Sequence, residues 1–118
     1  MFRITKEFHF SASHQLTHLP ADHQCARLHG HNYIVEVELS ADELDENGFV
    51  RDYHELAPLK HYIDERFDHR HLNDVFGHDR VTSEWLAKHF FDWCKQRLPE
   101  TSAVRVSETP KTWAEYRA

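Results

Sequence analysis

The chain has 118 residues, which is enough for one domain with a substantial hydrophobic core. Hydrophobic residues at 40% and charged residues at 29% are typical of a folded domain and exclude a disordered chain. The formal charge of −6 argues against direct binding of nucleic acid or of an anionic membrane. No apolar run is long enough to span a bilayer or to act as a signal peptide, so we expect a cytoplasmic protein.

Two segments in the first third of the chain alternate with the period of a half-buried strand. The apolar face of residues 2–14 ends in a histidine and carries Ile4, Phe8, Phe10, Ala12 and His14. The apolar face of residues 31–40 carries Tyr33, Val35, Val37 and Leu39, and His29 and His31 precede it in the same row. We therefore predict two strands whose core-facing rows each end in histidine.

Two helices and two further strands are predicted in the rest of the chain. A turn at 45–48 and a short strand at 49–52 lead to a helix that starts at Asp52 or, because Pro58 removes a backbone donor, at about Ala57. That helix reaches about Phe67, and a second one, capped by Thr82, reaches about Arg97. Strands over 104–108 and 113–117 complete a single α+β domain, residues 1–118, of order β-β-α-α-β-β.

The histidines have the spacing of a metal site. Side chains two apart on a strand point the same way about 6.5 Å apart at Cα, so His29 and His31 can reach one ion. His14 supplies a third nitrogen if the two strands pair as an antiparallel hairpin. Three neutral imidazoles suit zinc and leave one position open, as in catalytic sites. For a single histidine a structural role is the commoner outcome, but the combination favours metal.

Cys25 has two possible roles beside these histidines. It is either a fourth ligand, which makes the zinc site closed and structural, or a free thiolate that acts as a base or nucleophile near Arg27. The residues alone leave both open. Cys94 falls on the inward face of the second helix and is expected to be an inert core thiol.

Three further titratable residues are candidates for the same chemistry. Asp68 can orient its neighbour His69 and support the imidazolium, although a histidine after a helix can also simply meet the helix dipole. Glu108 continues the apolar row of Val104 and Val106, where a buried carboxylate needs a partner. It lies either at a sheet edge or in a pocket, where its two oxygens suit the N–H pair of a guanine-like or pterin ring.

Six stretches taken in order resemble the 6-pyruvoyl-tetrahydropterin synthase family: "FSASH", "CARLHGHNY", "FVRDY", "FDHRHLN", "TSEWLA" and "VSET". The short interval from Cys25 to His29 resembles the 6-carboxy-5,6,7,8-tetrahydropterin synthase branch, whose members serve queuosine biosynthesis. The resemblance implies the tunnelling fold (T-fold), a four-stranded antiparallel sheet with two helices on one face. It also implies a homohexamer built as two trimers.

By the same resemblance His14, His29 and His31 hold Zn²⁺, Cys25 accepts a proton, and Asp68 with His69 forms a relay. Glu108 anchors the pterin and belongs to the catalytic set, and the stretch that lines the pterin pocket matches Thr82, Ser83 and Glu84. The substrate implied is 7,8-dihydroneopterin 3'-triphosphate. The products are 6-carboxytetrahydropterin, acetaldehyde and triphosphate.

The sequence leaves open which side chains bind the triphosphate, and it leaves two alternative functions for the protein. The candidates that are cationic or protonatable near the site are Arg27, His18 and His23. The alternatives are a pyruvoyl-type lyase, which releases triphosphate without acetaldehyde, and a non-catalytic zinc module with Cys25 as fourth ligand.

Overall fold

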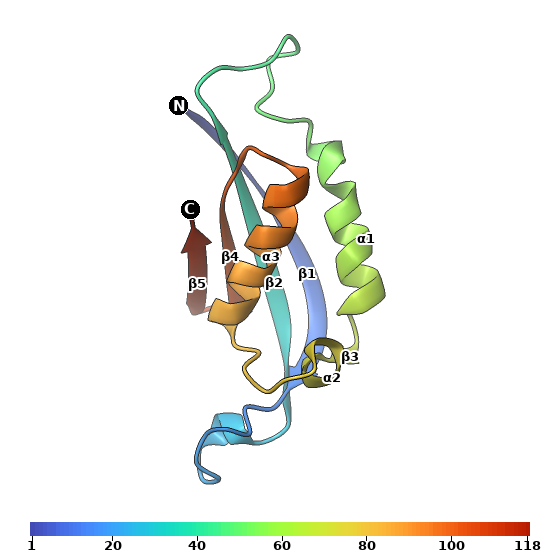
Figure 1. Ribbon diagram of the computed structural model, residues 1–118, viewed down its shortest axis with the longest axis vertical. Coiled ribbons are helices and arrows are strands. Elements are labelled where there is room, and N and C mark those ends of the chain that lie inside the picture. The colour runs from blue at the N-terminus through green and yellow to red at the C-terminus, as the bar shows by residue number, and fades with distance from the viewer.

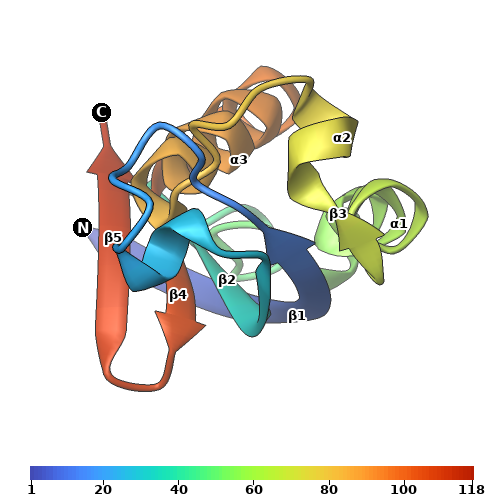
Figure 2. The ribbon, with the colours of Figure 1, turned by 90° about the horizontal axis from the view of Figure 1, so that it is seen from below.

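The computed structural model describes all 118 residues and has two layers, a sheet and a layer of helices on one of its faces (Figures 1 and 2). The strands are β1 (Phe2–His14), β2 (His29–Ala41), β3 (Arg70–His71), β4 (Thr101–Thr109) and β5 (Thr112–Arg117). The helices are α1 (Ala57–Arg66), α2 (Leu72–Phe76) and α3 (Ser83–Arg97). This is the predicted α+β class, with β1, β2, β4 and β5 as the four antiparallel strands.

The sheet has the order β3-β1-β2-β4-β5 and is built around the long hairpin of β1 and β2. Both strands have 13 residues, and their pairing runs from Phe2 opposite Ala41 to His14 opposite His29. Strands of this length span roughly 40 Å, which accounts for the elongated molecule of 55 × 25 × 23 Å. The register places all three candidate ligands at one end of the hairpin.

The core lies between the sheet and the two long helices. Alternate residues of β1, β2 and β4 face the helices, so the apolar rows predicted from the sequence are buried there. The predicted stripe of α1, Leu56, Leu59, Ile63 and Phe67, is buried as well. On α3 the predicted Leu86, Phe90 and Cys94 are buried, whereas Trp93 is only half-buried, and Ala87 and Phe91 complete the inward face.

The start of the first helix agrees with both the Asp52 cap and the position of Pro58 in the sequence. The Asp52 carboxylate accepts a hydrogen bond from the His54 amide and caps a 3-10 turn, Tyr53–Leu56, and the α-helix proper starts at Ala57. Pro58 thus stands in the first turn of α1, where its missing N–H has no intrahelical partner to lose.

Three local features differ from the prediction. Residues 49–52 contain a bend and no strand, and the Arg51 guanidinium binds Glu55 and Glu100 there. Two short elements, β3 and α2, were not predicted. β3 pairs in parallel with Ala12 and Ser13 at the edge of the sheet.

The helix-free face of the sheet carries an ionic network. The Glu38 side chain is fully buried although no helix covers it, because arginine side chains close over it. Arg105 and Arg117 donate to its oxygens at 2.7 and 2.9 Å, and Arg3 lies at 3.4 Å. Burial opposes ionisation, but hydrogen bonds from Arg117, Ser102 and Arg105 lower the pKa of Glu38 to about 2.

Two edges of the sheet have unpaired backbone groups. Outside β1, only Ala12 and Ser13 have a neighbour, and β5 has none on its outer side. None of the helices combines the length and the apolar character needed to cross a membrane.

Candidate active site

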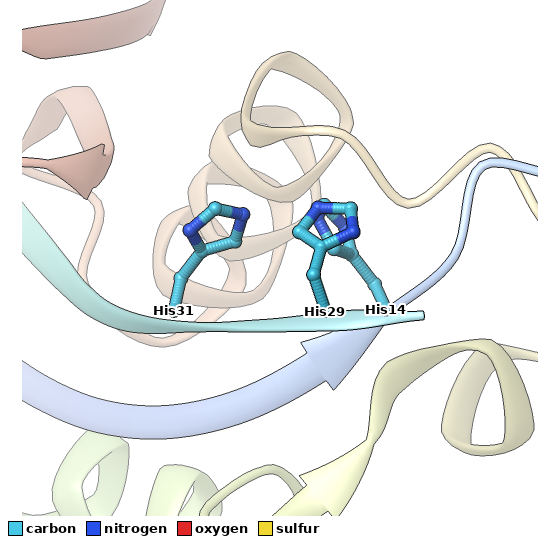
Figure 3. Close-up of side chains that lie close together, drawn as sticks. All are labelled: His14, His29 and His31. Carbon is cyan, nitrogen blue, oxygen red and sulfur yellow. The ribbon is translucent and has the colours of Figure 1, made fainter. Parts of the chain in front are cut away.

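His14, His29 and His31 converge at the end of the β1–β2 hairpin, on the side of the sheet that faces the helices (Figure 3). One ring nitrogen from each residue lies within 4.8 Å of the others. The ring centroids of His14 lie 4.5 Å from His29 and 5.1 Å from His31, and the rings meet edge to face. The antiparallel pairing of His14 with His29 therefore assembles the group predicted from the sequence.

Two of the rings are held with a defined nitrogen toward the centre. The His14 Nδ1 lies 2.7 Å from the Val81 carbonyl oxygen, and the His29 Nδ1 lies 2.6 Å from the Arg27 carbonyl oxygen. A carbonyl only accepts, so both Nδ1 atoms carry hydrogen and both Nε2 lone pairs are free. Backbone partners of this kind orient and fix the tautomer of metal-binding histidines.

The surroundings of His14 and His31 disfavour the charged form of both rings. Burial is the main cause that lowers the pKa of His14 and of His31, the neighbouring histidines add to it, and the Glu108 carboxylate opposes it. His14 Nε2 and His31 Nε2 are both buried and have no protein hydrogen-bond partner. A metal ion would satisfy both lone pairs, so the residues fit a three-histidine metal centre.

Glu108 lies beside this group. Its Oε2 is 3.6 Å from His31 Nε2, and its side chain is 24% exposed. The carboxylate is therefore at the rim of the site, which is intermediate between the exposed sheet edge and the buried pocket considered from the sequence. At least one of its oxygens can accept a hydrogen bond from a ligand.

Cys25 lies on the loop that joins β1 to β2, in a short 3-10 turn, Gln24–Ala26. Its amide donates to His23 Nδ1 at 3.0 Å, and its carbonyl accepts from the Leu16 amide at 3.0 Å, which ties the turn to the end of β1. The thiol is free and half-buried, and it is not one of the three grouped ligands. Cys94 is also free, and burial raises the pKa of its thiol to about 12, as expected for an inert core residue.

Asp68 and His69 form a fixed pair at the other edge of the hairpin. Asp68 Oδ1 accepts the Ser11 amide at 2.9 Å, and its Oδ2 lies 3.0 Å from His69 Nδ1. The hydrogen bond from Ser11, followed by that from His69, lowers the pKa of Asp68, so the carboxylate is ionised. His69 has a φ of 59°, an uncommon backbone conformation for a residue with a side chain.

The His69 ring is 81% exposed and lines an open cleft of about 440 Å³. The cleft is mostly polar, and its lining includes His31 of the histidine group as well as Ser11, Ser13, Asn32, Arg70 and His71. No hydrogen bond or ion pair of the chain joins Cys25 to Asp68 or His69. Within one chain, therefore, the two predicted parts of the proton relay are not directly bonded to each other.

The remaining predicted residues are not part of the three-histidine group, although Thr82 follows Val81, whose carbonyl holds His14. The Thr82 hydroxyl accepts from the Trp85 amide as the cap of α3, and Ser83 donates to Glu84 at 2.9 Å. Thr82 and Glu84 line a second cleft of about 570 Å³ between α3 and β5. The side chains of Arg27, His18 and His23 are exposed on the loop before β2.

Sequence reasoning missed the groups that position these side chains. Two are backbone carbonyls, those of Arg27 and Val81, and one is the Ser11 amide. Backbone groups leave no signal in the residue types. Tyr33, by contrast, stands in the predicted row directly after His31, so its position in the site could have been found.

Known proteins resemble the chain over its whole length. The sequence model of the family described as 6-pyruvoyl tetrahydropterin synthase matches residues 3–118. A 6-carboxy-5,6,7,8-tetrahydropterin synthase from Synechocystis sp. is 37% identical over 122 residues, with 98% of this chain and 93% of that protein covered. One from Bacillus subtilis is 34% identical over 128 residues, with 98% and 85% covered.

A solved structure agrees with these sequences. The 6-pyruvoyl tetrahydropterin synthase of Caenorhabditis elegans superposes with a TM-score of 0.85 at 28% identity, with 99% of this chain and 95% of that chain covered. The match is complete in both directions, so the likeness extends to the entire domain. The chain belongs to the 6-pyruvoyl tetrahydropterin synthase family.

Proposed function

We propose that this protein is a zinc-dependent carbon–carbon lyase that converts 7,8-dihydroneopterin 3'-triphosphate to 6-carboxy-5,6,7,8-tetrahydropterin, acetaldehyde and triphosphate. The observation that carries the proposal is the three-histidine group, in which one nitrogen from each ring lies within 4.8 Å of the others, in a member of this family. Three ligands leave a position for substrate.

His14, His29 and His31 are the residues that would hold the zinc ion. When bound there, zinc would orient the side-chain hydroxyl groups of the substrate and make them more acidic. Zinc is favoured over other ions by the donor set, because neutral imidazoles without carboxylate ligands suit it well.

Three residues move protons in the proposed reaction. The Cys25 thiolate removes a carbon-bound proton from the substrate side chain. His69 transfers protons as triphosphate leaves and the side chain is cleaved, and Asp68 holds the ring by its Nδ1 atom at 3.0 Å. The amide of Ser11 holds Asp68 in turn, which ties the relay to the core of the sheet.

The substrate is bound through both of its ends in this proposal. Glu108 accepts the N–H pair of the pterin ring, and Thr82, Ser83 and Glu84 line the rest of the ring pocket. Arg27, with His18 and His23 on the same loop, is available for the triphosphate because all three residues are exposed.

The carboxytetrahydropterin reaction is preferred for two reasons. The relatives at 37% and 34% identity carry that name, and the Cys25-x3-His29 interval has the short form typical of that branch. A pyruvoyl-type lyase remains the second candidate, since the family and the structure from Caenorhabditis elegans carry that name. A closed zinc module is disfavoured because Cys25 is absent from the ligand group.

The proposal extends to assembly and cellular role. The open edges of β1 and β5 favour a homohexamer of two trimers, in which sheets pair edge to edge. His69 is 81% exposed, and a second chain that covers it could bring Cys25 to it. The role proposed is a cytoplasmic step of queuosine biosynthesis.

Incubation of the pure protein with 7,8-dihydroneopterin 3'-triphosphate tests the reaction. Release of acetaldehyde with 6-carboxytetrahydropterin, detected by mass spectrometry and by aldehyde trapping, is expected. Triphosphate release without acetaldehyde would select the pyruvoyl-type reaction. Absence of both products from zinc-loaded protein would contradict the proposal.

The Cys25→Ala variant separates an enzyme from a zinc module. We expect it to retain one zinc per chain and to lose turnover by two or more orders of magnitude, since the thiolate moves a proton and does not bind the metal. Cys94→Ala is the control, because its thiol is buried in the core, and it should keep its zinc and its turnover per folded chain. Loss of zinc from Cys25→Ala would contradict the assignment.

A further inference from the structure

Three buried side-chain polar atoms lack a protein hydrogen-bond partner: His14 Nε2, His31 Nε2 and Tyr33 Oη. The first two belong to the proposed metal ligands, which explains them. The Tyr33 hydroxyl has no such explanation. An unpartnered buried hydroxyl costs about 1–3 kcal/mol, so folded proteins rarely keep one without a use.

Tyr33 is fixed next to the histidines. It lies two residues after His31 on β2, so it faces the same side of the sheet (Figure 3 shows this part of β2). Its ring centroid is 5.5 Å from that of His31 and 6.1 Å from that of His14. On the other side it stacks on Phe10, its partner in the register, at 4.9 Å. The residue is 0% exposed, so bulk water does not reach it.

A second tyrosine near the core, which is only partly buried, has a hydrogen-bond partner within the chain. Tyr62, in the helical layer, places its Oη 2.7 Å from His89 Nε2, so a partner is provided within the chain. The Glu108 carboxylate lies 3.6 Å from His31. Burial first, and then this carboxylate, raise the pKa of Tyr33, but no hydrogen bond joins the carboxylate to the Tyr33 hydroxyl. Tyr33 therefore has a donor to offer at the site and no protein acceptor for it.

We propose that the Tyr33 hydroxyl is a positioning group of the metal site. It donates a hydrogen bond to the oxygen atom, from water or from a substrate alcohol, that would occupy the metal position left open by the three histidines. This rests on the proposed metal site and adds a residue to it. A donor at this place fixes the direction of the oxygen ligand, while the histidines fix the ion. The hydroxyl is unsatisfied in the metal-free chain and becomes satisfied when the site is filled.

The test is a comparison of Tyr33→Phe with the matched control Tyr62→Phe, each in chelator-treated and zinc-loaded protein. Chemical unfolding gives the stability of both forms, and competition with a chromophoric chelator gives the zinc affinity. Metal-free Tyr33→Phe should be at least as stable as the wild type, and its zinc affinity should fall on the order of fivefold, the value of one hydrogen bond. Tyr62→Phe should lose stability equally in both forms and keep its zinc affinity.

A second readout uses cobalt(II) alone in place of zinc. The visible absorption of the cobalt-loaded protein should shift in Tyr33→Phe and stay unchanged in Tyr62→Phe, because only the first changes the surroundings of the oxygen ligand. Loss of stability in metal-free Tyr33→Phe, or an unchanged zinc affinity, would overturn the inference and leave the metal site standing. Failure of the wild type to bind zinc would overturn both.

Discussion

At the scale of single residues, two of the three proposed metal ligands are oriented by a backbone carbonyl on the far side of the ring. The Val81 and Arg27 carbonyls hold the Nδ1 atoms of His14 and His29, so the donor atoms are in place before any ion arrives. The sheet that carries the ligands is stabilised by the β1–β2 pairing and by apolar packing, neither of which involves a metal. Metal binding is therefore separable from folding.

Removal of one ligand should abolish metal binding and leave the fold. We expect His29→Ala and His31→Ala each to lose their zinc, measured by elemental analysis after gel filtration, while the far-ultraviolet circular dichroism of both stays as in the wild type. His69→Ala is the control and should keep one zinc per chain, because His69 is not one of the three grouped histidines. Full zinc content in both ligand variants would exclude the site.

A second residue-scale prediction concerns Glu38. Its pKa is lowered to about 2 from an ordinary value of 4.5, so its contribution to the free energy of unfolding is fully present above pH 4.5 and is lost as the pH falls toward 2. We expect Glu38→Gln to lose on the order of 3 kcal/mol at pH 7 and to show a smaller further loss between pH 4.5 and 2 than the wild type.

Denaturant unfolding at several pH values measures the effect of Glu38→Gln. Glu36→Gln is the matched control, since Glu36 is partly exposed and binds Arg105 alone, at 2.8 Å. Its loss should be under about 1 kcal/mol. Equal losses in the two variants would contradict the special role of the buried carboxylate.

The residues that could be predicted are those whose side chains follow a local period. His29 and His31 are two apart on a strand, so their convergence follows from the period alone, and His14 required only the antiparallel hairpin. The burial of Glu38 could not be predicted in this way. Its partners Arg105 and Arg117 are 67 and 79 residues away, and only the order of strands brings them together.

At the scale of elements, α3 is the part with the clearest start signal. The Thr82 hydroxyl accepts the Trp85 amide at 3.1 Å, and Glu84 and two basic residues complement the helix dipole at the two ends. The helix carries five buried residues onto β4 and β5. Capping at Thr82 therefore supports the core as well as the cleft that Thr82 lines.

Thr82→Ala should destabilise the protein by about 1 kcal/mol through loss of the cap, and Thr82→Ser should restore most of it. Thermal and denaturant unfolding measure this, with Ser83→Ala as a control whose effect stays within about 0.5 kcal/mol. If Thr82 also contacts the pterin, the Michaelis constant rises in Thr82→Ala and returns in Thr82→Ser. Unchanged stability in Thr82→Ala would show that the cap is not required.

The long helices and strands were predicted because several sequence features mark each of them, whereas the short elements were missed. β1, β2, α1 and α3 each combine a period with a cap or a turn. β3 has two residues and exists only because the chain passes the end of β1 after His69, whose amide donates to the Ser11 carbonyl. The strand predicted at 49–52 was wrong: the segment bends, Val50 packs against the core and Phe49 is exposed.

At the scale of the whole molecule, the two parts of the proposed relay face different neighbours. Cys25 lies on the loop at the end of the hairpin near the histidines, whereas His69 projects at the β1 edge into an open cleft. β1 leaves most of its outer edge unpaired, and β5 leaves the whole of its outer edge. An assembly that pairs these edges would bring the Cys25 of one chain near the His69 of another.

Subunit mixing tests this arrangement. Cys25→Ala and His69→Ala should each be inactive alone, because each lacks one half of the proton relay. After the two are dissociated together and reassembled, some sites contain an intact Cys25 from one chain and an intact His69 from the other, so a fraction of the wild-type turnover should return. Native mass spectrometry verifies exchange of subunits. Mixed oligomers that form but stay inactive would mean that both residues of each site come from the same chain.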